Sequence, residues 1–166
     1  MAGWSPATPL SSLLPYNGFT TPHPEPCLAI AIRLSQAHID AMIQHALEDA
    51  PIEACGLLAT KDGAVVEVRR ARNREASPYR FSIDPLETRK HEQAIDDSGA
   101  ELAGFYHSHT GSPPIPSPTD IRMMGPFFGP PFVHFIIGVA DLENPEVRAW
   151  YIDGPERIEQ EFEVIP

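Results

Sequence analysis

The chain has 166 residues, of which 42% are hydrophobic and 21% charged, and its formal net charge is −11. This length and balance are typical of one globular domain with a buried core. No apolar run approaches the roughly 20 residues that a membrane-spanning helix needs, and the N-terminus lacks the basic segment of a secretory signal. The acidic balance argues against nucleic-acid binding, which depends on Lys and Arg at phosphates. We therefore expect a cytoplasmic protein that binds neither nucleic acid nor membrane.

Residues 1–27 differ in composition from the rest of the chain. They hold six prolines, one acidic residue and no basic residue, which is typical of a flexible or extended arm. Aromatic and leucine side chains within this stretch could pack on the body of the protein or on a partner. We therefore divide the chain into a Pro-rich N-terminal arm at 1–27 and a folded domain at 28–166.

Periodicity and turn residues predict mixed strands and helices along the folded domain. In chain order these are a strand at 28–32, a helix at 35–49, strands at 55–59 and 65–70, a helix at 84–98, a strand from 101 to the histidine motif, a short helix at 117–124, and strands at 132–139, 146–152 and 158–164. Asp62-Gly63 predicts a hairpin turn, and Ser35 and Pro85 suit helix N-termini. This irregular order of elements indicates an α+β fold.

Two histidines and an aspartate stand close together in the second half of the chain. The sequence runs Gly-Phe-Tyr-His-Ser-His to His109, and after a loop continues Ser-Pro-Thr-Asp to Asp120. Two imidazoles and one carboxylate suit a divalent transition metal, and a catalytic zinc uses three protein ligands and an open fourth position. Because no cysteine closes this set, His107, His109 and Asp120 predict a catalytic site. The alternative is a satisfied polar cluster at a strand end.

The spacing of these residues also predicts their geometry. On a strand, residues two apart face the same side, so His107 and His109 should point together while Ser108 points away. The Pro- and Gly-rich residues 110–116 cannot continue the strand. Ser117 then suits a helix N-cap and Asp120 falls in the first turn, so the loop can bring Asp120 back to the two histidines.

The pattern His-x-His, seven residues, Ser-x-x-Asp resembles the JAMM (MPN-plus) family of zinc metallopeptidases, in a short prokaryotic-type form. Upstream, Glu53-Ala54-Cys55-Gly56 looks like the family's Glu-x-x-Gly segment at the start of a strand. The resemblance runs from about residue 34 to about residue 151. It implies a curved, mostly antiparallel, mixed sheet flanked by two main helices, with a short helix at the zinc site.

The resemblance also assigns roles to individual residues. It implies one Zn²⁺ per chain, held by His107, His109 and Asp120, and Glu53 as the base that takes a proton from zinc-bound water and later gives it to the leaving amine. Zinc lowers the pKa of bound water to roughly 7, which makes such a base useful at neutral pH. Ser117 resembles the serine that hydrogen-bonds the developing oxyanion, although N-capping competes for its hydroxyl.

These roles imply hydrolysis of a peptide or isopeptide bond at the C-terminal tail of a ubiquitin-like protein. The chain lacks the long metal-binding insertion of polyubiquitin-cleaving members, so we favour a sulfur-carrier protein as substrate. Two alternatives stay open: a non-catalytic MPN-type scaffold, and a zinc hydrolase of small amides. A homodimer is also expected from the family resemblance.

Other polar residues have simpler interpretations. Cys27 and Cys55 make no disulfide framework, and Cys55 is expected to be a small buried side chain rather than a redox group. Ser108 and His134 are expected to play structural roles. The arginines between residues 69 and 80 suit a solvated face, with a substrate-binding patch as the alternative.

Overall fold

The computed structural model describes residues 32–166, so the arm predicted at 1–27 lies outside the described residues. The elements are β1 (Ile32–Ser35), α1 (Gln36–Asp49), β2 (Cys55–Lys61), β3 (Ala64–Ala71), α2 (Pro85–Asp97), β4 (Glu101–His109), α3 (Pro118–Met124), β5 (Val133–Gly138), β6 (Glu146–Asp153), β7 (Glu156–Gln160) and β8 (Phe162–Ile165). The two long helices and the short third helix lie where the sequence predicted them. No helix among these residues is long and apolar enough to cross a membrane.

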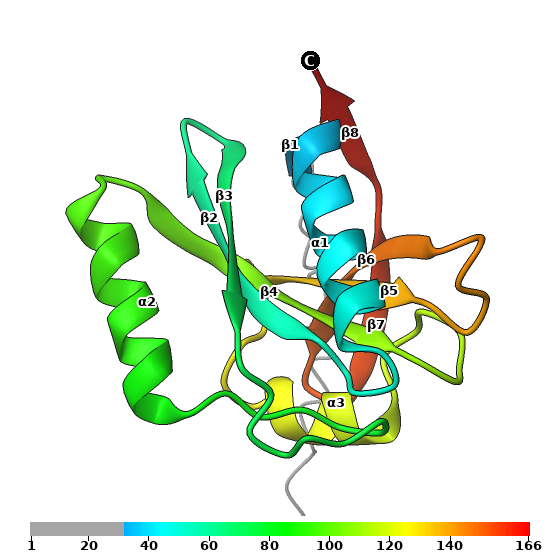
Figure 1. Cartoon of the computed structure of the whole chain (residues 1–166). Helices are drawn as coiled ribbons and strands as arrows, with labels where there is room; N and C mark the ends of the chain where they lie inside the picture. Colours follow the sequence, from blue (N-terminus) through cyan, green and yellow to red (C-terminus); the bar gives the residue numbers. More distant parts are fainter. Residues whose placement is uncertain (1–31) are drawn as a thin grey trace, which may run out of the picture.

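The described strands form one eight-stranded sheet in the order β7-β6-β5-β4-β2-β3-β1-β8. Within residues 32–166, four neighbouring strand pairs are antiparallel and three are parallel. Strands β7 and β8 follow each other in the chain but form opposite edges of the sheet, and Glu161 is the single residue between them. One residue spans at most about 3.6 Å, so the sheet must curl until its two edges approach each other (Figure 1). The predicted curved, mixed sheet is confirmed.

One strand prediction was wrong, and the predicted end of another was too early. Residues 158–164 do not form one strand, because the chain leaves β6 after Gln160 and resumes at Phe162 beside β1. The apolar and polar residues keep alternating from β7 into β8, so the sequence pattern does not show that the neighbouring strand changes from β6 to β1. Within the described residues the first strand is Ile32–Ser35, so it extends past the predicted end at residue 32, while residues 28–31 lie outside the described part. Parallel pairing with β8 places the strand there, since Ile32 pairs with Phe162 and Ser35 with Ile165.

The sheet has an apolar layer on each face. On one face, α1 packs Met42 and Ala46 into a core that includes Leu58 and Tyr106. On the other face, Phe105 belongs to a second cluster with Met124 of α3. Helix α2 lies on the opposite side of the sheet from α1 (Figure 1). Because successive residues of β4 alternate between faces, the odd-numbered positions that include the histidines lie on the face with α3.

Strand β4 is an interior strand, paired with β2 on one side and β5 on the other. In register, His107 lies opposite Cys55 of β2 and Ile136 of β5. The motif glycine beside this site is explained by packing: a Cβ on Gly56 would lie 2.3 Å from the ring of Tyr106, a separation that atoms cannot adopt. The sheet centre therefore holds the histidine strand and the Glu53 segment in fixed register.

Candidate metal centre and active site

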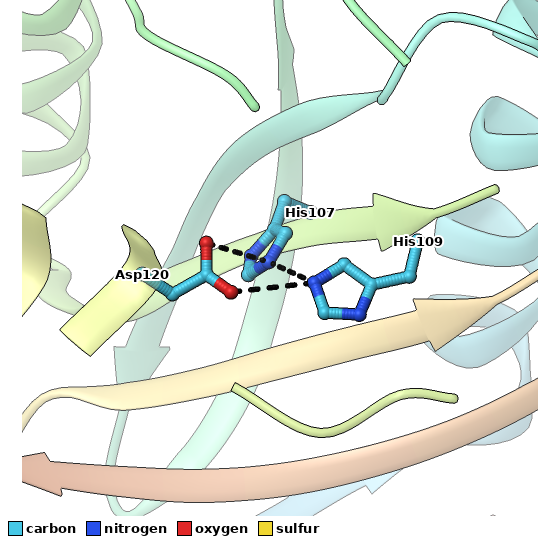
Figure 2. A group of neighbouring side chains, drawn as sticks. All are labelled: His107, His109 and Asp120. Atoms are coloured by element: carbon cyan, nitrogen blue, oxygen red, sulfur yellow. Dashed lines mark hydrogen bonds and ion pairs between the residues drawn. The ribbon is translucent and has the colours of Figure 1, made fainter. Parts of the chain in front are cut away.

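His107 and His109 lie at the C-terminal end of β4, and Asp120 reaches them from the first turn of α3 (Figure 2). The two Nε2 atoms are 3.1 Å apart. One Asp120 oxygen lies 3.5 Å from Nε2 of His107, and the other lies 3.3 Å from Nε2 of His109. All three side chains are buried. The structure thus brings together the three residues that the sequence predicted as metal ligands.

Helix capping explains how Asp120 is directed to this point. Ser117 caps α3: its Oγ accepts a hydrogen bond from the Asp120 amide at 3.2 Å, and its own amide donates to Asp120 Oδ2 at 2.6 Å. This reciprocal capping box fixes both residues. Ser117 Oγ accepts in this contact, and a hydroxyl group can accept and donate at the same time. Capping and oxyanion binding are therefore compatible for this serine.

The loop before α3 is fastened to the far strands of the sheet. The indole Nε1 of Trp150 in β6 donates to the Pro114 carbonyl at 2.9 Å, and Arg157 in β7 donates to the Pro116 carbonyl at 2.7 Å. Pro114 is buried. These contacts hold the Pro-rich loop across the end of the sheet. Sequence reasoning missed both anchors, because they join segments more than 35 residues apart.

Two contacts orient the histidine rings. His109 Nδ1 lies 2.8 Å from the Pro113 carbonyl, and a carbonyl can only accept, so Nδ1 carries the proton and Nε2 presents its lone pair to the cluster. The ring of Phe81 stacks on His107, with centroids 4.5 Å apart and planes 24° from parallel. Each ring is therefore held in place before any metal binds.

The donor set and its spacing fit a zinc ion. Ligand bonds of about 2.0–2.1 Å in a tetrahedral site place neighbouring donor atoms about 3.3–3.4 Å apart, close to the 3.1–3.5 Å measured here. Burial lowers the pKa of His107, which keeps that ring neutral. Burial acts to raise the pKa of Asp120, but its hydrogen bonds with both histidines outweigh this and hold it well below its usual range. A neutral imidazole and an ionised carboxylate are the forms that bind metals.

Glu53 lies in the short turn between α1 and β2, two residues before the strand position opposite His107. Its side chain is 4% exposed. Burial raises the pKa of its carboxyl group to about 7, while the nearby charges of His109 and Asp120 act in opposite directions. A carboxyl group that titrates near neutrality can both take and return a proton there. Glu53 thus shares the buried environment of the metal cluster.

Asn73 is a further site residue that sequence reasoning missed. Its amide donates to the carbonyls of Glu53 at 2.9 Å and Arg80 at 3.1 Å, and its oxygen accepts from the amides of Glu75 at 3.0 Å and Ser82 at 3.3 Å. This buried side chain ties Glu53 to the loop that carries the ring stacked on His107. A lone Asn among arginines gives no pattern in the sequence, so only the structure identifies it.

A cavity of about 190 Å³ opens beside the cluster. Most of its wall is apolar, and Asp120 forms part of it. The lining residues are Phe81, Ser82, Ile83, Thr88, Phe105, Thr119, Asp120, Met123, Met124 and Phe128. A substrate chain therefore has a place to lie against the metal cluster.

Three residues were predicted to have structural rather than catalytic roles, and their contacts and burial agree with this prediction. Ser108 Oγ accepts from the Ala54 amide at 2.8 Å, which joins the residue after Glu53 to β4. His134 is buried and bonds to the Phe128 carbonyl at 2.8 Å. Cys55 is fully buried, and burial raises the pKa of its thiol to about 12. The thiol therefore stays protonated, which favours packing over redox chemistry.

Comparison with known proteins places this site in a family. The family model described as prokaryotic homologs of the JAB domain matches residues 35–153. The desampylase of Pyrococcus furiosus is 31% identical over 127 residues, 76% of this chain and 85% of that protein. The CysO-cysteine peptidase of Mycobacterium tuberculosis is 33% identical over 120 residues, 70% of this chain and 80% of that one.

A solved structure also resembles this fold. The solution structure of protein DSY2949 from Desulfitobacterium hafniense superposes with a TM-score of 0.72 at 31% identity, covering 81% of this chain and 92% of that one. The matched family segment includes the metal cluster and Glu53. The chain therefore belongs to the prokaryotic branch of the JAB-domain (JAMM-type) family of hydrolases.

Proposed function

We propose that the protein is a zinc-dependent metallopeptidase that hydrolyses a peptide or isopeptide bond at the C-terminal tail of a ubiquitin-like protein. The observation that carries this proposal is the buried Glu53 carboxyl beside the His107, His109 and Asp120 cluster. Relatives named desampylase and CysO-cysteine peptidase support a tail of this kind as the substrate. We favour a sulfur-carrier protein, because the chain lacks the long metal-binding insertion of polyubiquitin-cleaving family members.

Each residue has a distinct part in the proposed reaction. His107, His109 and Asp120 would hold one zinc ion, which when bound would act as a Lewis acid on the scissile carbonyl and lower the pKa of water. Glu53 takes a proton from the attacking water and returns it to the leaving nitrogen. Ser117 directs its O–H at the oxygen of the carbonyl as negative charge develops. One water is consumed, giving a carboxylic acid and an amine.

The cavity beside Asp120 supports an extended tail as the substrate segment. Its apolar wall, formed in part by Phe105, Met124 and Phe128, buries the chain that precedes the scissile bond. A cytoplasmic location, expected from the sequence, and a homodimer, expected from the family resemblance, are part of the same proposal.

The experiment uses ubiquitin-like sulfur-carrier proteins whose C-terminal Gly-Gly is extended by one cysteine, and, as a second series, Gly-Gly joined to a lysine side chain. Purified protein with supplied zinc is incubated with each, and mass spectrometry locates the cleaved bond. We expect hydrolysis after the second glycine in at least one series. Glu53→Gln is expected to retain zinc and lose cleavage, because the amide cannot accept the proton.

The alternatives give different outcomes in this experiment. A small-amide hydrolase would cleave short acyl-glycine amides and leave every protein fusion intact. A scaffold would bind a ubiquitin-like protein without cleaving it, even with zinc present. Cleavage that survives in Glu53→Gln would remove this residue from the mechanism.

A further inference from the structure

Basic residues are concentrated beside the active site. Residues 69–90 hold seven of the twelve Lys and Arg residues of the chain, but only three of its 23 acidic residues. The remainder of the chain is therefore more acidic than its net charge of −11 indicates. This segment comprises the end of β3, the loop to α2 and the first half of α2 (Figure 1).

Part of this segment surrounds a hollow of about 550 Å³. The residues that line it are Arg72, Arg74, Asp84, Leu86, Glu87 and Lys90, and we call it the basic hollow. Its three basic side chains belong to exposed residues, and Leu86 is 72% exposed. Arginine around an exposed apolar side chain is the composition of a protein-binding surface.

The two acidic side chains of the basic hollow have intramolecular partners. Asp84 caps α2 by accepting from the Leu86 amide at 2.8 Å. Glu87 accepts from the Arg72 amide at 3.0 Å and lies 3.6 Å from His91 Nε2.

Within residues 32–166, no carboxylate forms a salt bridge with Arg72, Arg74 or Lys90. The positive charge of the hollow is thus available to a second molecule.

The basic hollow and the cavity beside the metal cluster are lined by residues that are neighbours in the chain. Ser82 and Ile83 line the cavity, and the next residue, Asp84, lines the hollow. In α2, Glu87 lines the hollow and the next residue, Thr88, lines the cavity. A protein bound in the hollow therefore has a short path for its tail to the metal cluster.

We propose that the basic hollow docks an acidic face on the folded body of the ubiquitin-like partner and so directs the partner's C-terminal tail into the cavity beside Asp120. This inference rests on the proposed function. An acidic partner is repelled by most of this acidic chain and attracted at the hollow, so the charge pattern both attracts and orients it. The hollow then selects among ubiquitin-like proteins by their surface charge.

The test measures binding separately from cleavage. Full-length protein carrying Glu53→Gln is titrated by calorimetry with an acidic ubiquitin-like sulfur carrier that ends in Gly-Gly-cysteine. Adding Arg72→Glu, Arg74→Glu and Lys90→Glu is expected to weaken binding at least about tenfold, and the neutral set Arg72→Gln, Arg74→Gln and Lys90→Gln about threefold or more. Lys61→Glu, an exposed site at the far end of β2, is the matched control and is expected to bind like the parent.

A second readout separates docking from tail recognition. This readout uses protein that keeps its native Glu53. The combined charge reversals Arg72→Glu, Arg74→Glu and Lys90→Glu are expected to lower kcat/KM for the full conjugate about tenfold more than for its C-terminal hexapeptide conjugate. Added salt should reduce the difference between parent and variant.

Three results would overturn the inference. They are equal affinity in the parent and both variant sets, no binding of any acidic carrier, or a loss of binding by Lys61→Glu as large as that of the charge-reversed set. Binding that depends on the hollow, without cleavage by the zinc-loaded protein, would support docking and contradict only the proposed function.

Discussion

The side-chain amide of Asn73 donates a hydrogen bond to the backbone carbonyl of Glu53, at 2.9 Å. The same side chain bonds to three other backbone groups of the loop that follows β3. Because Phe81 in this loop stacks on His107, one asparagine connects the proposed proton carrier to the orientation of a proposed metal ligand. The loop thus helps to build the site as well as to line it.

Asn73→Ala is expected to lower both stability and activity. It leaves buried backbone groups without partners, at a cost of about 2–4 kcal/mol in the free energy of unfolding, and it frees Glu53 to shift. Asn73→Asp keeps the acceptor for Glu75 and Ser82 but loses the donor to Glu53, so it should regain part of the stability and little of kcat. Urea unfolding and conjugate cleavage measure the two effects. Wild-type kcat in both variants would contradict this role.

Metal binding is expected to depend on the three clustered residues. We predict about one zinc per purified chain, lost in His107→Ala and reduced at least about a hundredfold in affinity in Asp120→Asn. Asp120→Asn keeps a side-chain oxygen that can accept from the Ser117 amide but removes the negative charge. His91→Gln, on α2, is the control that should keep its zinc. Mass spectrometry of the metal content, beside thermal unfolding, checks this, and a wild type that binds no supplied zinc would refute it.

Local pattern was enough to predict much of the site. Alternation on a strand placed His107 and His109 on one side, and the N-cap signal at Ser117 placed Asp120 in the first turn of a helix. The Asp62-Gly63 signal located the hairpin, where both residues have positive φ. Each of these features depends on residues a few positions apart, for which backbone geometry alone sets the direction of the side chains.

Features that depend on distant partners were not predicted. Trp150 and Arg157 hold the proline loop, and Asn73 holds Glu53, through contacts between segments 20 or more residues apart. The break at Glu161 is similar, because alternation does not tell which edge a strand joins. Such contacts are selected by packing of the whole sheet rather than by local propensity.

The pH dependence of stability is expected to report on Glu53 in the metal-free protein. Its pKa is raised from 4.5 to about 7 in the folded state. The preference of the folded state for the protonated carboxyl therefore stabilises the protein fully below pH 4.5, and this stabilisation is lost as the pH rises to 7. Glu53→Gln does not ionise. Its unfolding free energy relative to wild type should therefore rise by about 3 kcal/mol between pH 4 and pH 8. Urea unfolding at several pH values tests this, and a constant difference would contradict burial of the charge.

The two roles of Ser117 can be separated by substitution. Ser117→Ala removes the cap and the hydroxyl, and we expect a loss of about 1 kcal/mol in stability and a fall in kcat of about a hundredfold or more. Glycine is a fair N-cap, so Ser117→Gly should recover most of the stability but none of the kcat, because the donor is still absent. Ser117→Thr keeps both groups and should retain part of each. Activity that follows stability across the three variants would show that capping is the whole contribution of this serine.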